Sequence, residues 1–322
     1  MFDFKKTLKP MLFIIGAALI AHGGSAWAQE AKKIRIGWQK GVFNEAVIKA
    51  QGDLAKSLKA KGIDVEWAEF QVGPPMMEAL NVGSLDVAAA ANTPPVFAQV
   101  AGADFVYIAS EAPTPGDQQI LVQKDSPIKS AKDLVGKKVA IPKGSMAHYM
   151  VIKYMESNGL KFSDITPVYL SPADGRAALE GGAVAAWAAF DPLMAGAQAT
   201  GRVRVLADGF QVKVNNRQMY YARRDFANKN PQLVKDLLAE IRKTSQYTYN
   251  NTKEVAQKYA GFIGLDAKTF EVVLERNKVN DIISPLNDEI IAEQQTLADA
   301  FYRLKIIPKN VNVNEAVWKP AE

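Results

Sequence analysis

The chain has 322 residues, of which 48% are hydrophobic and 23% charged, with a formal net charge of +5 and no cysteine. This length suits one large domain or two medium ones. The lack of cysteine excludes a disulfide framework, thiolate catalysis, Cys-ligated zinc and a lipid-modified cysteine anchor. Because no block of like charges or basic run interleaved with aromatics appears, nucleic-acid binding is not expected.

The first 28 residues have the pattern of a cleavable secretory signal. Lysines at positions 5, 6 and 9 precede the apolar run MLFIIGAALIA, and a small-x-small site follows at Ala26-Trp27-Ala28. The apolar run is shorter than the ~20 residues that a membrane span needs. We therefore expect residues 1–28 to be removed by cleavage after Ala28.

From residue 32 onward, apolar runs typical of strands alternate with helical patterns. The predicted elements are a strand over 32–38, a helix over 44–62, a strand over 63–70, a short helix over 75–84, a buried strand over 85–91, a helix from about Pro94, strands over 104–110 and 119–124, a short helix over 130–136, a strand over 137–142, a helix over 146–159, a strand over 165–170, a helix over 174–182 and a strand over 203–208. This alternation with short loops favours doubly wound parallel sheets.

Beyond about residue 228 the pattern changes to long helices, predicted over 230–251, 252–264, 266–278 and 288–305. Two polar joints, 111–119 and 208–218, bracket the middle of the chain. We therefore predict an α/β fold with two doubly wound lobes and a ligand cleft between them. Residues 29–112 would form the first part of lobe 1, 113–212 lobe 2, and 213–322 the completion of lobe 1 and the C-terminal helices.

Four strand-to-helix junctions are the candidate ligand site, because ligands on such sheets bind beyond the carboxyl ends of the strands. They are Gln39-Lys40-Gly41, Asn92-Thr93-Pro94-Pro95, Lys143-Gly144-Ser145 and Phe190-Asp191-Pro192. Each junction alone is compatible with an ordinary helix cap. Helix N-termini carry unpaired N–H groups and a partial positive charge, so several in one cleft would bind an anion without a buried lysine or arginine.

Catalytic and metal chemistry find little support in these residues. Ser145 and His148 lack an orienting carboxylate and a G-x-S-x-G elbow, and their side chains on one helical turn point apart. The chain has neither a phosphate-loop spacing nor a D-x-D-x-D-G loop, so no cofactor or metal is expected. Packing is the favoured role for His148, with ligand contact as the alternative. Trp187 and Phe190 belong either to the core or to an apolar wall beside Asp191.

Eight stretches spread over the mature chain form a recognisable set. They are RIGWQKG (35–41), EALNVGSLDV (78–87), PPVFAQVAGADFVYIA (94–109), DSPIKSAKDLVGKKVA (125–140), KGSMAH (143–148), LSPADGRAAL (170–179), AWAAFDP (186–192) and QQTLADAFYRLKIIPK (294–309). As a set they resemble the periplasmic aliphatic sulfonate-binding proteins of ABC importers, a branch close to the taurine- and nitrate-binding proteins. The resemblance implies a type II periplasmic-binding fold that closes on an anionic headgroup, acts as a monomer and delivers its ligand to a membrane permease driven by an ATPase.

The junctions and the resemblance together give the candidate ligand-binding residues. They are Gln39, Asn92, Thr93, Gln119, Gly144, Ser145, Met146, His148, Trp187, Phe190 and Asp191. The chain departs from the family pattern at Asn92, where the family has Gly-Asp before Pro-Pro, at Met146 for a small polar residue, at Ala185 for Asp and at Phe190 for Trp. These departures suggest a more apolar pocket, suited to an aryl or longer alkyl sulfonate or to a sulfate ester.

The predicted function is therefore capture of a small organic anion in the periplasm, without catalysis. Two alternatives remain open at this point. One is a periplasmic enzyme of the same fold that acts on a sulfate ester or a related small molecule. The other is a sensory ligand-binding protein that serves no importer.

Overall fold

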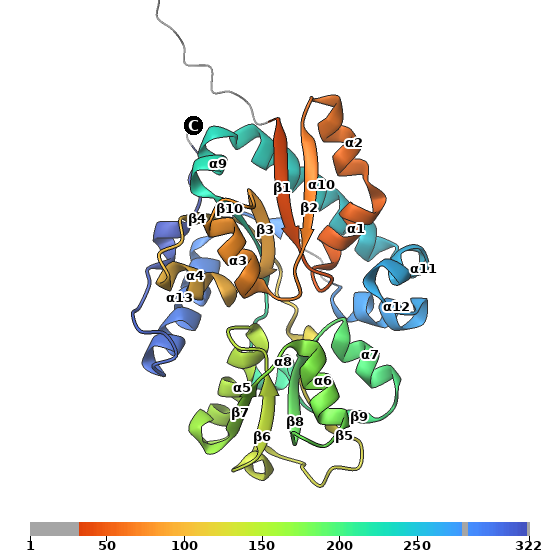
Figure 1. Ribbon diagram of the computed structural model, residues 1–322, viewed down its shortest axis with the longest axis vertical. Coiled ribbons are helices and arrows are strands. Elements are labelled where there is room, and N and C mark those ends of the chain that lie inside the picture. The colour runs from red at the N-terminus through yellow and green to blue at the C-terminus, as the bar shows by residue number, and fades with distance from the viewer. Residues whose placement is uncertain (1–31, 279–282, 321–322) are drawn as a thin grey trace, which may run out of the picture.

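The structure is a computed structural model that describes residues 32–278 and 283–320, and the predicted signal at 1–28 lies outside these residues. Two lobes lie one above the other along the longest axis of the molecule (Figure 1). Each lobe is a β-sheet with helices on both faces. Within the described residues, no helix combines the length and the apolar character needed to cross a bilayer.

The first lobe contains a six-stranded sheet of order β11-β4-β10-β3-β1-β2. Its strands are β1 (Lys33–Trp38), β2 (Asp64–Glu69), β3 (Val87–Ala91), β4 (Phe105–Glu111), β10 (Gln218–Arg223) and β11 (Ile283–Ser284). β1 pairs in parallel with both β2 and β3. β4 is buried along its whole length because helices cover both faces of the sheet.

Helices α1 (Phe43–Gln51), α3 (Gly73–Asn81) and α4 (Pro94–Val100) follow strands and begin at the edge of the first lobe that faces the second lobe. Helix α2 (Asp53–Ala60) continues from α1, and α9 (Arg224–Lys229) follows β10 at the far end of the sheet (Figure 1). The single helix predicted over 44–62 is in fact two helices. Gly52 adopts the left-handed conformation with φ 74°, which ends α1 and starts α2 in a new direction.

The second lobe contains a five-stranded sheet of order β7-β6-β8-β5-β9. Its strands are β5 (Gln118–Gln123), β6 (Lys138–Ile141), β7 (Thr166–Tyr169), β8 (Ala186–Phe190) and β9 (Val203–Asp208), and its helices are α5 (Met146–Ser157), α6 (Pro172–Glu180), α7 (Leu193–Ala199) and α8 (Gly209–Val212). The segment predicted as a short helix over 130–136 is a 3₁₀ turn at Ala131–Leu134.

The doubly wound fold has the predicted parallel pairs, but its sheets are not parallel throughout. Each sheet holds one antiparallel strand in its interior, and the short edge strand β11 also pairs antiparallel with β4. β10 lies antiparallel between β3 and β4, and β5 lies antiparallel between β8 and β9. Both strands come directly after a passage of the chain from one lobe to the other. β5 and β10 begin at the cleft, whereas the strands beside them end there. Each crossing therefore gives the strand that follows it a direction opposite to that of its neighbours.

The two crossing segments, which lie before β5 and before β10, run side by side between the lobes. The Thr114 N–H in the first donates a hydrogen bond of 2.7 Å to the Asn216 carbonyl in the second. We call residues 112–117 and 209–217 the hinge. Because the chain crosses twice, two chain segments connect the lobes, and they are hydrogen-bonded to each other.

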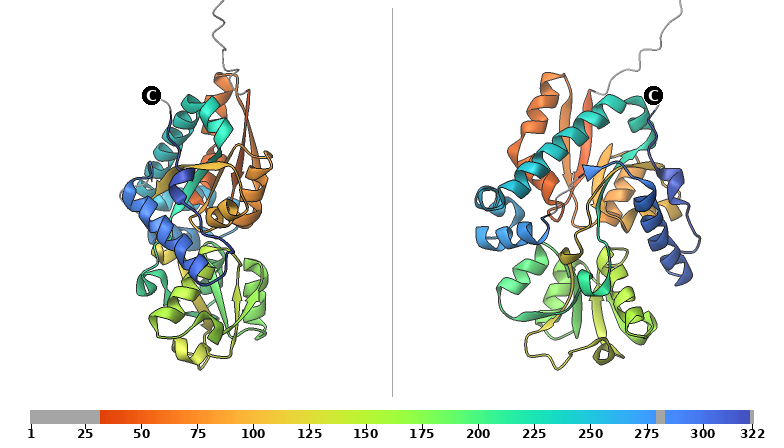
Figure 2. Two further views of the ribbon diagram at one scale, coloured as in Figure 1. Left: turned by 90° about the vertical axis from the view of Figure 1, so that its left-hand side faces the viewer. Right: turned by 180° about the vertical axis from the view of Figure 1, so that it is seen from behind.

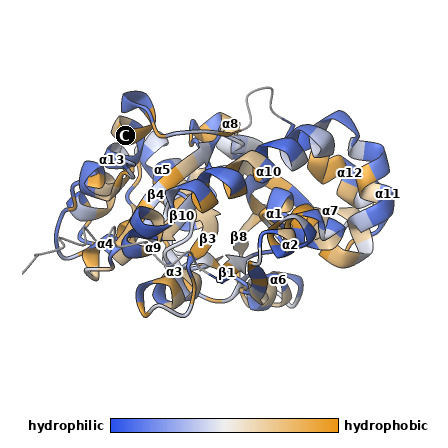
Figure 3. Ribbon diagram, turned by 90° about the horizontal axis from the view of Figure 1, so that it is seen from above, coloured by the Kyte–Doolittle hydropathy of each residue, from blue (hydrophilic) through white to orange (hydrophobic). Residues whose placement is uncertain are grey.

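Long helices complete the first lobe: α10 (Pro231–Asn250), α11 (Thr252–Ile263), α12 (Ala267–Arg276) and α13 (Asp288–Arg303). Seen from behind, α10 crosses the back of the first sheet (Figure 2). Its buried face includes Leu233, Leu237 and Ile241, spaced by four residues as one helix stripe requires. Hydrophilic and hydrophobic stretches alternate along these outer helices, as amphipathic helices should (Figure 3).

α13 packs against both lobes. The ring of Phe301 lies 5.2 Å from that of Phe97 in the first lobe and 5.6 Å from that of Tyr149 in the second. A large core cluster accordingly contains residues of both lobes. The lobes are therefore in contact on this side of the molecule.

Candidate functional site

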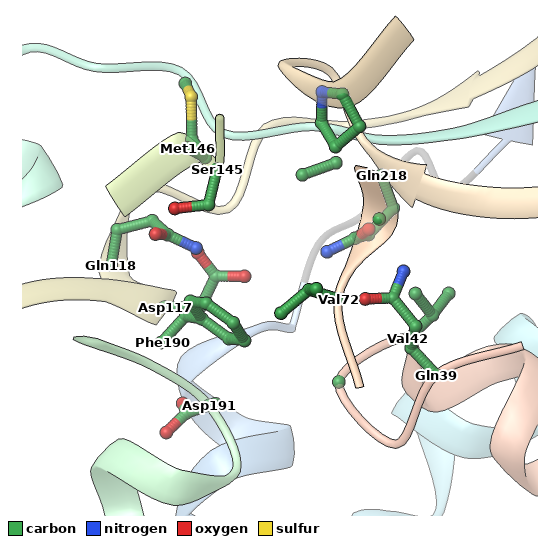
Figure 4. A pocket seen from close by; sticks show the side chains of 14 residues that line it. Gln39, Val42, Val72, Asp117, Gln118, Ser145, Met146, Phe190, Asp191 and Gln218 are labelled. Atoms are coloured by element: carbon green, nitrogen blue, oxygen red, sulfur yellow. The ribbon is translucent and has the colours of Figure 1, made fainter. Parts of the chain in front are cut away.

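A pocket lies between the lobes, at the cleft ends of β1, β3, β5, β8 and β10 (Figure 4). It is lined by Gln39, Gly41, Val42, Val72, Gly73, Ala91, Pro94, Asp117, Gln118, Ser145, Met146, Phe190, Asp191 and Gln218. The space open to the centre of a water molecule is about 40 Å³. On this measure it would hold roughly three waters, which is the scale of a ligand headgroup.

The N-terminal ends of several helices point at this pocket. Val42 is the residue before α1, Gly73 and Pro94 are the first residues of α3 and α4, and Met146 is the first residue of α5. The first N–H groups of a helix have no partner within it, and the aligned peptide dipoles add partial positive charge there. Prolines occupy the first turns of α3 and α4 and have no N–H to donate, so these two helix starts act mainly through their dipoles. Residues from all four predicted strand-to-helix junctions line this pocket.

The lining groups carry no cationic side chain: lysine, arginine and histidine are absent from the described residues that line the pocket. The polar groups are the amides of Gln39, Gln118 and Gln218, the Ser145 hydroxyl and two carboxyls. Positive potential at the pocket therefore comes from main-chain N–H groups.

Ser145 caps α5, as the sequence predicts. Its Oγ accepts a hydrogen bond from the His148 N–H at 3.3 Å and donates one to the Pro142 carbonyl at 2.6 Å. The Ser145 N–H is already donated to the Pro142 carbonyl at 3.2 Å. The preceding Gly144 has φ 73°, a conformation that favours glycine. The first N–H of this junction left for a ligand is therefore that of Met146 rather than that of Ser145.

Met146 and Thr93 join the two lobes at the edge of the pocket. The Thr93 hydroxyl donates a hydrogen bond to the Met146 sulfur at 3.2 Å. Thr93 stands at the N-cap position of α4 but makes no side-chain cap bond. Both residues are buried, and of the two only Met146 is part of the pocket lining.

Gln39 and Asn92, from neighbouring strands, have different positions. The Gln39 Nε2 donates to the Ala89 carbonyl at 3.1 Å, and its amide oxygen points into the pocket (Figure 4). Asn92 lies behind the lining, where its Nδ2 donates to the Asn215 carbonyl at 3.2 Å.

The Asp191 junction is tied to a C-terminal helix. The Asp191 carboxylate accepts hydrogen bonds from the Ala195 N–H at 3.1 Å and from Arg276 of α12 at 3.0 Å. Burial raises the pKa of Asp191 to about 6, while Arg276 acts to lower it. Helix α7 begins at Leu193, one residue later than the expected start at Pro192, and the Asp191-Pro192 peptide bond is cis.

Gln119 belongs to this same network and not to the pocket lining. Its Oε1 accepts from the Gln198 Nε2 at 2.7 Å, and the Gln198 Oε1 accepts from Arg276 at 3.0 Å. Gln118, one residue earlier, lines the pocket instead. Successive side chains of a strand point to opposite faces, so only one of the two glutamines can face the ligand.

Asp117, at the end of the first crossing, is a lining residue that the sequence did not single out. Its two carboxylate oxygens accept from the Asn216 Nδ2 at 2.9 and 3.0 Å, and Thr114 donates at 3.4 Å. Burial raises the pKa of Asp117 to about 8, and the nearby Asp191 contributes to the rise. The only signal available in the sequence was its place in a polar joint.

Gln218, the first residue of β10, is the second lining residue without a sequence signal. It is the last residue of the other polar joint. Phe190 contributes apolar surface to the pocket.

Trp187 and His148 lie in the core of the second lobe, outside the lining. Trp187 is fully buried, and its ring packs so closely on Gly175 of α6 that a Cβ there would lie 2.8 Å from it. His148 is fully buried among the rings of Phe162, Tyr169 and Phe301, with centroids 5.3 to 5.9 Å away. Burial, with a smaller effect from Lys143, lowers the pKa of His148 to about 4.

Among residues 32–278 and 283–320, no group of three or more histidine, aspartate or glutamate side chains is arranged to hold a metal ion.

Two sheets joined by a double crossing, with helix N-termini around a pocket between them, define the bilobal fold of the type II periplasmic binding proteins. Comparison with known proteins agrees. The NMT1/THI5 like family matches residues 58–255. A protein of Escherichia coli (strain K12) named as an aliphatic sulfonates-binding protein is 39% identical over 308 residues, which cover 95% of each chain. The chain belongs to this family of aliphatic sulfonate-binding proteins.

Solved structures give the same result for the fold. The alkanesulfonate-binding protein SsuA from Xanthomonas axonopodis pv. citri, bound to MOPS, is 35% identical with a TM-score of 0.84, over 90% of this chain and 99% of that one. The desulfurization enzyme DSZB is 14% identical with a TM-score of 0.65, over 89% of this chain and 96% of that one. The second likeness concerns the fold alone.

Proposed function

We propose that this protein is an exported solute-binding protein that holds the sulfonate group of a small organic anion in the interlobe pocket and delivers the ligand to an ABC importer. The observation that carries the proposal is the convergence of helix N-termini on a pocket whose described lining has no cationic side chain. Such a site binds an anion through main-chain N–H groups. The E. coli and Xanthomonas relatives, which are named as sulfonate-binding proteins, support a sulfonate as that anion.

In the proposed mode of binding, sulfonate oxygens accept a hydrogen bond from the Met146 N–H at the start of α5 and lie near the N-terminal ends of α1, α3 and α4. Phe190 and the Met146 side chain lie against the first carbons of the tail. A ligand that contacts both lobes favours the closed arrangement, because it makes more contacts there than with either lobe alone. The importer can then distinguish loaded from empty protein by shape.

The Met146 N–H can be removed with little disturbance of the helix. Met146 is the first helical residue, where proline is tolerated, and Ser145 before it has an extended backbone that proline accepts. We expect Met146→Pro to weaken sulfonate binding by about tenfold or more, since it removes a charge-assisted hydrogen bond. Met146→Ala is the matched control, because it also loses the side chain but keeps the N–H. Equal affinities of the two variants in isothermal titration calorimetry would reject the assigned site.

The ligand class is tested by a thermal-shift screen of the mature protein. The panel contains alkanesulfonates, arylsulfonates, sulfate esters, taurine and nitrate. We expect organosulfonates to raise the melting temperature, because binding to the folded state alone stabilises it. Stabilisation by nitrate with no response to any organosulfonate would overturn the proposal.

We further propose that the protein binds without catalysis. The distant enzyme neighbour supports only a shared fold, and this chain has no cysteine with which to form a thiolate nucleophile. Incubation with aryl sulfate esters should release no sulfate, and steady release above a heat-denatured control would favour the enzyme alternative. Co-purification of the loaded protein with a permease and an ATPase encoded beside its gene would separate an importer component from a sensor.

Export and oligomeric state complete the proposal. We expect the secreted protein to begin at Gln29 and to be monomeric. Intact-mass measurement and light scattering on protein from the periplasm check both statements. A protein that retains residues 1–28 would contradict the cleavage.

A further inference from the structure

Asp117 is an anionic group at a pocket that we propose to bind an anion. It is buried, with 4% of its surface exposed, and it lines the pocket from the hinge side. One of its carboxylate oxygens points toward the middle of the pocket (Figure 4). A carboxylate placed this way must affect which ligands can bind.

The partners of this carboxyl group are all neutral. Asn216 and Thr114 donate to it from the hinge, and the Gln118 amide also hydrogen-bonds it. Within the described part of the chain, no lysine, arginine or histidine forms an ion pair with Asp117. The carboxyl group is held in position, and among the described residues no cationic side chain balances its carboxylate form.

The second carboxyl of the pocket provides a contrast. Asp191 forms a buried ion pair with Arg276 at 3.0 Å, and its carboxylate points away from the middle of the pocket (Figure 4). Its charge is therefore balanced within the protein. Of the two, only Asp117 is left to interact with a charge on the ligand.

We propose that the physiological ligand carries a protonated amine as well as a sulfonate, and that Asp117 receives the amine while the start of α5 receives the sulfonate. This inference rests on the proposed function. A purely anionic ligand gains nothing from the carboxylate form of Asp117, whereas an ammonium group would both balance that carboxylate and donate hydrogen bonds to it. Asp117 thereby selects aminosulfonates over alkanesulfonates.

The environment of Asp117 also predicts that ligand binding changes its protonation. Burial has the largest effect on the pKa of Asp117, which is about 8, and the charge of Asp191 raises it further. Tyr249 of α10 is a further ionisable group nearby, and burial raises the pKa of that tyrosine, with Asp117 adding to the effect. Near neutral pH the empty pocket then holds a largely protonated Asp117. An incoming ammonium group favours the carboxylate form, so binding of an aminosulfonate should release a proton into solution, and binding of an alkanesulfonate should not.

The first test uses pairs of ligands that differ only by an ammonium group in place of a methyl group. Homotaurine is compared with butanesulfonate, and taurine with propanesulfonate, by calorimetry on the wild-type mature protein. We expect the amine of at least one pair to bind about tenfold or more tightly, with proton release detected from the dependence of the heat on buffer ionisation. If each alkanesulfonate binds as tightly as its amine, Asp117 does not select a cation and the inference is wrong.

The second test uses two matched variants. Asp117→Asn keeps the size and removes the charge, and we expect it to abolish both the preference for the amine and the proton release. Asp191→Asn removes the other carboxyl charge, and we expect it to weaken both ligands of a pair alike and leave the preference in place. A preference that persists in Asp117→Asn overturns the inference. If Asp117→Asn fails to fold, the comparison of paired ligands on the wild-type protein still tests whether the pocket prefers an amine.

The outcomes also separate this inference from the proposed function. If neither member of any pair binds, sulfonate capture itself is wrong. If alkanesulfonates bind tightly and amines bind no better, capture stands and only the role of Asp117 fails.

Discussion

His148 shows that a residue type common in binding sites can have a purely structural position in the core. The sequence made it a candidate for ligand contact or for packing, and the structure places it in a cage of aromatic rings with its Nε2 atom buried and without a hydrogen-bond partner. A neutral imidazole is tolerated there, but a charged one is not. Its function is therefore structural.

This position makes a prediction for stability at acid pH. The pKa of His148 is lowered to about 4 in the folded protein, against about 6.5 when unfolded. The unfolded state therefore binds the proton first, and stability should fall as the pH drops from about 6.5 toward 4, by up to about 3 kcal/mol. His148→Gln should lose this part of the dependence, measured by chemical denaturation across that range. It is the only histidine outside the first 28 residues, so the comparison is free of other imidazoles.

Lining residues illustrate what a sequence can reveal about a site. Gln39, Ser145, Met146, Phe190 and Asp191 all line the pocket, because each stands at a strand-to-helix junction that the β–α alternation makes visible. Asp117 lies within the first polar joint and Gln218 is the last residue of the second, and no spacing marks them. They reach the pocket only because both crossings of the chain pass beside it.

At the scale of elements, most strands and helices could be predicted because their periodicity is strong, and the main omission was β10. Its sequence, QMYYAR, has apolar residues that are buried between β3 and β4, but it follows a polar joint and precedes a helix as an ordinary loop might. This segment becomes a strand because the chain returns to the first sheet, where β3 and β4 provide its hydrogen-bonding partners. Local pattern alone does not carry this information.

The loop between β1 and α1 makes a close contact across the cleft. A Cβ on Gly41 would lie 2.9 Å from the Asp191 carbonyl oxygen of the other lobe. Gly41→Ala should therefore hinder closure and weaken sulfonate binding by about tenfold, with little change in the melting temperature of the empty protein, since the clash is relieved when the lobes part. Gly261→Ala, in α11 with open space around it, is the control and should bind normally. Tight binding by Gly41→Ala would show that this contact does not limit closure.

At the scale of the whole molecule, two ion pairs among residues 32–278 and 283–320 connect the lobes, and they differ in burial. Arg276 of α12 pairs with the buried Asp191, whereas Arg303 of α13 pairs with Glu156 at 3.0 Å with 59% of the arginine side chain exposed. A buried pair is costly to break because it leaves a buried charge, but an exposed pair contributes little. The two pairs should therefore contribute unequally to the closed arrangement.

We expect Arg276→Met to shift the free-energy difference between the closed and open forms of the empty protein by about 2 kcal/mol in favour of the open form. This value is lower than that for a completely buried ion pair, because Arg276 is partly exposed. Small-angle X-ray scattering should then show a larger radius of gyration, and ligand binding should weaken. Arg303→Met is the control and should scatter as the wild type does. If both variants scatter alike, the buried pair is not what holds the lobes together.

The interior position of β10 also has a consequence for how the chain is made. The first sheet needs residues 218–223 to join β3 to β4, so it is incomplete until the ribosome has passed well beyond the middle of the message. Until then β3 and β4 have no strand between them, and the N-terminal part cannot close into a stable lobe of its own. The connectivity itself therefore postpones completion of the first sheet until at least residue 223 of 322 has been made. Under the export that we propose, this delay would help to keep the chain unfolded for translocation.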